Sequence, residues 1–91
     1  MSVLARFAPQ SMTSQQYDEA IRELEATGEF PPDGLEYHAC FGPEGSLRVS
    51  EIWESHEKMA AFAQRLMPIL AEAGINPGEP EFLEVHNTIS R

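Results

Sequence analysis

The chain has 91 residues, which predicts one domain with one hydrophobic core spanning residues 1–91. Fifteen acidic residues against six basic residues give a net charge of −9, and because such a surface repels phosphate backbones and anionic lipid headgroups, we expect no nucleic acid and no membrane as a partner. The single cysteine excludes an intrachain disulfide, and no apolar run reaches the roughly 20 residues that a membrane span requires, so the sequence predicts a cytoplasmic protein.

A strand and a helix are predicted at the start of the chain. Residues 2–7 (SVLARF) alternate as a strand does. Thr13 is a typical helix N-cap, Gln16 completes a capping box with it, and Gly28 suits the left-handed residue just past the helix end. The apolar stripe of this helix consists of Tyr17, Ala20, Ile21 and Leu24.

The middle of the chain predicts a β-hairpin. Residues 35–41 (LEYHACF) and 46–53 (SLRVSEIW) alternate as strands do, and the GPEG between them is a typical hairpin turn. The register implied by this turn pairs Cys40 with Leu47, His38 with Val49, and Glu36 with Glu51. A slip of one residue would exchange the two faces of one strand.

A second helix and a last strand complete the predicted elements. Ser55 is the N-cap of this helix and Gly74 ends it, while Pro68 removes one backbone hydrogen bond inside it and predicts a bend. Its apolar face consists of Met59, Phe62, Ala63, Leu66 and Leu70. Residues 81–87 (EFLEVHN) are predicted to form the last strand.

The predicted element order is β-α-β-β-α-β. Because crossover connections are right-handed, this order favours a ferredoxin-like α+β fold, in which both helices cover one face of an antiparallel sheet. We expect the first and third strands at the centre of the sheet and the second and fourth strands at its edges.

The strand alternation assigns side chains to the two faces of the sheet. One face carries His38, Val49, Glu51 and Trp53. The opposite face carries Leu35, Tyr37, Ala39, Phe41 and Ile52. Both faces are substantially apolar, and a monomer would expose one of them to water. We therefore expect a homodimer in which the uncovered faces of two copies pack together about a twofold axis.

Nearly the whole chain takes part in a resemblance to known proteins, carried by the stretches MTSQQYDEA, GLEYHACFGPEGSLRVSEIWES, MAAFAQRLMPILAEAG and EVHN. These stretches resemble the dimeric α+β barrel superfamily, especially its small antibiotic-biosynthesis-monooxygenase-like and stress-responsive barrel proteins. The resemblance implies a dimeric α+β barrel with a pocket between the sheet and the helices of each subunit. The superfamily contains cofactor-independent oxygenases, haem-using enzymes, lactone isomerases, polyketide cyclases and proteins without known activity.

The resemblance also implies roles for three residues. Trp53 matches a tryptophan late in the third strand that lines the pocket of the quinone-forming monooxygenases. Those enzymes carry, four residues earlier, an asparagine that holds the phenolic substrate, and Val49 stands at that position here, so this hydrogen-bond donor is absent. Polyketide-cyclase-like members use a strand histidine as a general base, and His38 is the candidate for that role.

The residues themselves single out His38 and Glu51. A histidine side chain can transfer protons near neutral pH, and Glu51 is expected diagonally across from His38, at about 7–8 Å between Cα atoms, as the group that orients the base. The alternative is a hydrogen-bonded core histidine beside a carboxylate that reaches a rim or a helix N-terminus. Trp53, Tyr17, Val49 and Phe62 are predicted to form the substrate-binding wall, and Trp53 has the alternative of a plain core residue.

No His, Cys or carboxylate cluster has metal-ligand spacing and no phosphate-binding loop is present, so we expect neither a metal nor a cofactor. The sequence thus predicts a small homodimeric barrel with an apolar pocket for an aromatic or polyketide-like molecule, acting as a cofactor-independent monooxygenase. Two alternatives remain open: a His-assisted isomerase or cyclase, and a non-catalytic ligand-binding or interaction barrel.

Overall fold

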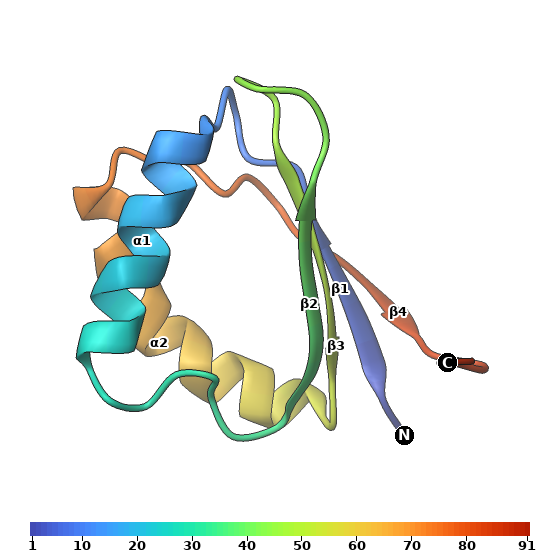
Figure 1. Ribbon diagram of the computed structural model, residues 1–91. Coiled ribbons are helices and arrows are strands. Elements are labelled where there is room, and N and C mark those ends of the chain that lie inside the picture. Colours follow the sequence, from blue (N-terminus) through green and yellow to red (C-terminus); the bar gives the residue numbers. More distant parts are fainter.

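The computed structural model describes all 91 residues and has the predicted element order. The elements are β1 (Val3–Phe7), α1 (Ser14–Ala26), β2 (Leu35–Phe41), β3 (Arg48–Trp53), α2 (His56–Glu72) and β4 (Glu81–Glu84). The four strands form one sheet in the spatial order β2-β3-β1-β4, and all three neighbouring pairs are antiparallel, so β3 and β1 lie at the centre as predicted. Both helices lie on one side of the sheet, and its other side is uncovered (Figure 1).

Three strands are shorter than the sequence predicts, β1 by its first residue only. β3 begins at Arg48 because Ser46 closes the turn onto the Pro43 carbonyl, and the amide of Leu47 donates to Met12 outside the sheet. β4 ends at Glu84 rather than at residue 87. Its partner β1 begins at Val3, and the last hydrogen bond between the two segments runs from the Val85 amide to the Ser2 carbonyl. Beyond this bond, residues 86 and 87 have no neighbouring strand to pair with.

The hairpin register differs from the predicted one by two residues. His38 pairs with Glu51 and Cys40 pairs with Val49, because the connection spans residues 42–47 and is longer than the GPEG turn alone. A shift of two residues preserves the face of every side chain. His38, Val49, Glu51 and Trp53 therefore share one face, as predicted, and this is the face that meets the helices.

The predicted face of Leu35 is wrong. A bulge between Leu35 and Tyr37 leaves Glu36 without a partner on β3, so Leu35 pairs with Trp53 and packs against the core beneath the helices. The extra residue reverses the alternation at this one point. Tyr37 and Phe41 remain on the uncovered face, where 53% and 42% of their surfaces are exposed.

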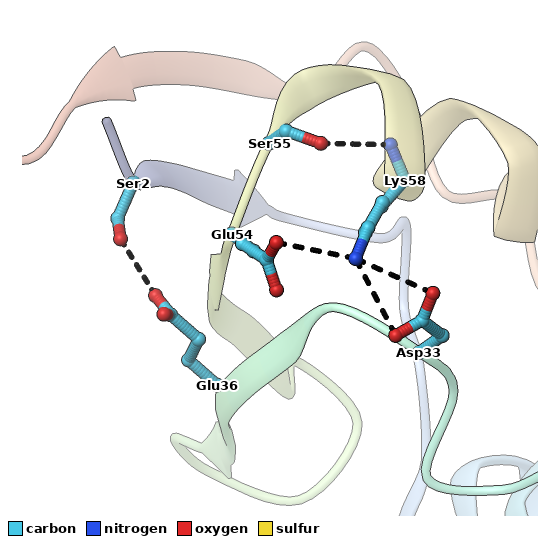
Figure 2. Close-up of polar contacts among 6 residues, drawn as sticks. All are labelled: Ser2, Asp33, Glu36, Glu54, Ser55 and Lys58. Atoms are coloured by element: carbon cyan, nitrogen blue, oxygen red, sulfur yellow. Dashed lines mark hydrogen bonds and ion pairs between the residues drawn. The ribbon is translucent and has the colours of Figure 1, made fainter.

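Both helices begin and end at the residues that the sequence indicates. The Thr13 side chain accepts a hydrogen bond from Gln16, whose own side chain accepts from the Thr13 amide, so the capping box of α1 is confirmed. Ser55 caps α2, and its hydroxyl oxygen accepts from the Lys58 amide (Figure 2). Pro68 lies inside α2, which continues through it to Glu72. No helix is both long and apolar enough to cross a membrane.

The loop between α1 and β2 is fastened to α2. Lys58 Nζ lies 3.2 Å from a carboxylate oxygen of Glu54 and 3.4 Å from one of Asp33 (Figure 2). The Glu54 amide also donates to the Gly34 carbonyl at 2.7 Å. Gly34 has φ +92°, and a Cβ there would lie 2.6 Å from Lys58 Cδ. This loop also carries Phe30, so its attachment positions one wall of the space beneath the helices.

The core between sheet and helices is divided into two clusters. One comprises Ala5, Leu24, Trp53, Met59 and Phe62. The other comprises Met12, Ala20, Val49 and Ile75. Only 11 of the 91 residues are buried, and this sparse packing leaves room for cavities between the two layers.

Candidate functional site

Four side chains form a continuous hydrogen-bonded chain beneath the helices. Tyr17 of α1 lies with its hydroxyl 2.6 Å from His38 Nε2, and His38 Nδ1 lies 2.6 Å from Glu51 Oε2. The Trp53 indole donates to the other carboxylate oxygen, Oε1, at 3.0 Å. The sheet register explains the meeting of these groups, because His38 lies directly opposite Glu51, and Trp53 follows two residues later on the same face.

The hydrogen bonds assign the protons of the site. A carboxylate can only accept hydrogen bonds, so His38 Nδ1 carries a hydrogen and donates it to Glu51. In the neutral imidazole, Nε2 then has a lone pair, which accepts the Tyr17 hydroxyl. Glu51 thus fixes the tautomer in which His38 presents its basic nitrogen to Tyr17.

The surroundings of Tyr17 keep its hydroxyl protonated. Burial raises the pKa of Tyr17 to about 12, and the neighbouring Cys40 and Glu51 contribute in the same direction. The ring of Tyr17 also stacks on His38 with 5.9 Å between ring centroids. Burial likewise raises the pKa of Cys40, with a further contribution from Asp18, so this thiol does not become a reactive thiolate at neutral pH.

The burial of Glu51 distinguishes between its two predicted roles, a group that orients His38 or a carboxylate that reaches a rim or a helix N-terminus. The residue is 7% exposed, reaches neither a rim nor a helix N-terminus, and uses both oxygens to accept hydrogen bonds from His38 and Trp53. No buried side-chain nitrogen or oxygen in the protein lacks a partner. A buried carboxylate with both oxygens engaged in this way is held in one orientation by its neighbours.

A cavity of about 70 Å³ lies against this hydrogen-bonded chain. Twelve of its 16 lining residues are hydrophobic, and polar side-chain groups reach it only from Tyr17, His38 and Glu51. Val49 and Phe62, both buried, belong to its walls. The lining therefore combines an apolar surface with a single acid–base group.

A second cavity, of about 180 Å³, adjoins the first on the side of β4. Its lining includes Trp53, Met59, Met67 and Phe82, and it shares Glu51 with the first cavity. The shared apolar residues between the two cavities are Phe7, Phe62, Leu66, Leu70 and Pro77. Glu51 thus borders both spaces, while Trp53 borders only the second.

The structure brings the six residues singled out in the sequence to one place. His38, Glu51, Tyr17, Val49 and Phe62 line the first cavity, and Trp53 lines the second. His38 and Glu51 lie directly opposite each other rather than diagonally, which corrects the predicted separation. The bond between Tyr17 and His38 was missed, since the helical pattern indicates that Tyr17 faces the sheet but not which strand residue its hydroxyl reaches. His56 and His86 are exposed, and no group of three or more potential ligand side chains is arranged to hold a metal ion.

No protein-family model matches the sequence. A comparison with curated proteins finds no match either.

Solved structures do share its fold. SnoaB, a cofactor-independent oxygenase from Streptomyces nogalater, is 17% identical, with a TM-score of 0.59 over 99% of this chain and 96% of that one. A candidate antibiotic biosynthesis monooxygenase from Deinococcus radiodurans is 13% identical, with a TM-score of 0.62 over 100% and 98% of the two chains. MupZ from Pseudomonas fluorescens is 11% identical, with a TM-score of 0.64 over 89% and 69%. The chain therefore has the ferredoxin-like α+β fold of antibiotic biosynthesis monooxygenase-like proteins, as the resemblance in its sequence implies.

Proposed function

We propose that the protein is an enzyme in which His38 removes a proton from the hydroxyl of an aromatic or polyketide-like molecule, and that the resulting anion reacts with O₂ without a cofactor. The observation that carries this proposal is the pair of 2.6 Å hydrogen bonds by which Glu51 orients His38 and His38 presents Nε2 beside an apolar cavity. A histidine oriented by a buried carboxylate is a general base whose protonated form the carboxylate stabilises.

The cavities suit a flat apolar ligand. The Phe62 ring lies 5.6 Å from the Trp53 ring and 6.4 Å from the Phe30 ring, measured between centroids, which gives the ligand an aromatic wall. Apolar walls exclude water, and a phenol hydroxyl placed against Nε2 would be the ligand's main polar contact. The phenolate would then remain beside the protonated imidazole until it reacts.

The oxygen step balances without an external reductant. In a phenol with hydrogen on the carbon para to the hydroxyl, the phenolate gives electrons to O₂ and a C–O bond forms at that carbon. The O–O bond then breaks, the carbon loses its hydrogen as a proton, and the products are a quinone and water. The substrate supplies all four electrons, which is consistent with the cofactor-independent oxygenase activity of SnoaB.

A second candidate uses the same base without oxygen. Tyr17 is the only hydroxyl donor in the lining of the first cavity, and the position of Val49 offers no amide to hold a phenolic oxygen. A base and a hydroxyl acid side by side suit proton transfer in an isomerisation or cyclisation. The third possibility is binding without conversion.

One assay separates the three candidates. The protein is incubated with hydroxynaphthalenes and hydroxyanthracenes under oxygen-18 gas, and O₂ uptake and label incorporation are measured. Uptake with one labelled oxygen in the product supports the oxygenase; conversion under nitrogen supports the isomerase or cyclase; binding without conversion supports the non-catalytic barrel.

Two variants test the role of His38. His38→Gln should lower turnover at least about a hundredfold, because the general base is lost. His86→Gln, at an exposed histidine beyond β4, is the matched control and should keep the wild-type rate. Equal rates in the wild type and His38→Gln would refute the proposal.

We also propose that two copies of the chain pair through the uncovered face of the sheet. One apolar row crosses all four strands there, formed by Tyr37, Ile52, Leu4 and Leu83 in register. Leu83 is 46% exposed and Tyr37 53% exposed, and a row of this kind on a single copy faces water.

Sedimentation at micromolar concentration should give a dimer for the wild type and a monomer for Leu83→Glu. Ala71→Glu adds the same charge on exposed α2 and should remain a dimer; a monomeric wild type would refute the pairing.

A further inference from the structure

Tyr17 separates the first cavity from a depression on the protein surface. The depression has a volume of about 290 Å³ and lies over the edge strand β2, where Leu35 and Glu36 contribute to its lining. Four residues line both spaces and form the partition between them: Tyr17, Ile21, Phe30 and His38. A ligand that enters from the depression must pass between these side chains.

Tyr17 also occupies the basic nitrogen of His38. Its hydroxyl lies 2.6 Å from Nε2 and its ring stacks on the imidazole. While this hydrogen bond exists, the lone pair of Nε2 is not free to accept a proton from a ligand. The same side chain thus closes the partition and masks the base.

We propose that Tyr17 is a specificity-determining gate, which moves aside only for a neutral ligand whose own hydroxyl replaces that of Tyr17 on His38 Nε2. This inference rests on the proposed function, since it names the ligand class that the base would accept. It identifies that class as neutral phenols and enols, and excludes both unsubstituted hydrocarbons and organic anions as good ligands.

The requirement for a hydroxyl follows from hydrogen-bond balance. If Tyr17 moves away, Nε2 loses its partner in a largely apolar space, which is unfavourable unless another donor takes its place. A phenol or enol supplies that donor, whereas a hydrocarbon of the same shape does not. The exchange therefore favours hydroxylated ligands over otherwise identical ones.

The requirement for neutrality follows from the charges around the entrance. Glu36 lies in the depression, Asp18 follows Tyr17 on α1, Glu51 is buried behind His38, and the chain carries a net charge of −9. An anionic ligand would be repelled by all of them. A neutral phenol would enter and lose its proton only at His38.

The position of Tyr17 permits this movement. The residue lies in the first turns of α1 and is only half-buried, so rotation of its side chain toward the depression leaves the backbone of the helix in place. Thr13 and Gln16 hold the helix start independently of the Tyr17 side chain. Tyr17→Phe, which keeps the ring and removes only the hydroxyl, should therefore fold.

Calorimetric titration without oxygen tests the gate through binding alone. Wild-type protein is titrated with 1-naphthol, naphthalene and 1-naphthoate, and Tyr17→Phe with the first two. The wild type should bind 1-naphthol more tightly than naphthalene, and 1-naphthoate most weakly. In Tyr17→Phe the affinity for 1-naphthol should rise about threefold to tenfold, because the competing hydroxyl is gone, and the affinity for naphthalene should not fall, because opening the partition no longer breaks a hydrogen bond. No gain for 1-naphthol, wild-type binding of naphthalene as tight as that of 1-naphthol, or tight binding of 1-naphthoate would overturn the gate.

Nitrogen-15 spectra of the imidazoles give a readout that a merely structural role would not move. Tyr17→Phe should shift the Nε2 resonance of His38, assigned by its loss in His38→Gln, and leave the resonances of His56 and His86 in place. An unchanged His38 resonance would overturn the gate. Because neither measurement involves turnover, a failure of the gate is distinct from a failure of the proposed enzyme activity.

Discussion

His38 and Glu51 lie directly opposite each other on the neighbouring strands β2 and β3, and a 2.6 Å hydrogen bond joins Nδ1 of the imidazole to the carboxylate. The carboxylate also holds the Trp53 indole, so its orientation is fixed from two sides. Glu51 therefore determines which imidazole nitrogen carries the hydrogen, and with it which nitrogen can act as a base.

Glu51→Gln is expected to reverse this assignment. If the glutamine oxygen accepts the Trp53 indole, its amide group donates to His38 Nδ1, and the hydrogen of the imidazole moves to Nε2. Turnover should fall by about a hundredfold to ten-thousandfold with little change in circular dichroism, because Nε2 can no longer accept a proton. Glu72→Gln, at an exposed carboxylate on α2, is the control; a fully active Glu51→Gln variant would contradict the role of Glu51.

Trp53→Phe is expected to destabilise the protein. Trp53 is 0% exposed, and the change removes both buried ring volume and the donor to Glu51 Oε1. We expect the free energy of unfolding to fall by roughly 2–4 kcal/mol, measured by urea denaturation with circular dichroism as the signal. A loss below about 0.5 kcal/mol, the range of ordinary surface changes, would show that this hydrogen bond and packing contribute little.

The ionisation of Tyr17 predicts a loss of stability in alkali. Burial raises the pKa of Tyr17 to about 12, whereas an unfolded tyrosine ionises near about 10. The folded form holds its proton more tightly, so this stabilisation is complete below about pH 10 and is lost as the pH rises toward about 12. Absorbance at about 295 nm should show one tyrosine that ionises at unusually high pH, and Tyr17→Phe should remove this titration. If the titration persists in that variant, it belongs to another group.

Glu44 predicts a loss of stability in acid. The Ser14 hydroxyl and amide donate to Glu44, the amide at 2.7 Å, and these bonds lower the pKa of the Glu44 carboxyl. A lowered value means that the stabilisation is present above the ordinary carboxyl range near about 4 and is lost as the pH falls through the lower value. Glu44→Gln should melt below the wild type at neutral pH, and the difference should vanish in acid. Glu72→Gln, at an exposed carboxylate, should show no such dependence.

Two glycines form a matched pair for testing close approach. Gly28 and Gly34 both have positive φ, but a Cβ at Gly28 meets nothing within 4 Å, whereas one at Gly34 meets the Lys58 side chain at 2.6 Å. Gly28→Ala should lose about 1–2 kcal/mol from backbone strain alone, and Gly34→Ala should lose more because Lys58 must also move. Equal losses in chemical denaturation would mean that Lys58 moves freely.

The sequence patterns predict the layers of this fold better than its pairings. Strand alternation assigns His38, Val49 and Glu51 to the correct face even though the predicted register is off by two residues, because the pattern repeats every two residues. The register itself depends on the connection 42–47, where the Leu47 amide bonds to the distant Met12 carbonyl. The bulge that turns Leu35 toward the helices is not indicated by any residue pattern as clear as the strand alternation.

The same distinction applies to the site. His38 and Glu51 could be recognised because they are polar residues on a face that meets the helices. The hydrogen bond between Tyr17 and His38 could not be recognised, because it depends on the spacing between α1 and β2, which the packing of both layers determines. Secondary-structure patterns indicate which side chains face the interior, and only the tertiary structure indicates which of them touch.

Trp53 is the only tryptophan of the chain, and its indole nitrogen is bonded to the carboxylate that orients His38. Indole emission responds to nearby charge and hydrogen bonding, so a ligand or a proton that arrives at the site should alter the fluorescence of the protein. The unmodified chain thus contains an intrinsic optical reporter beside the candidate site, and no added dye is needed to follow binding there.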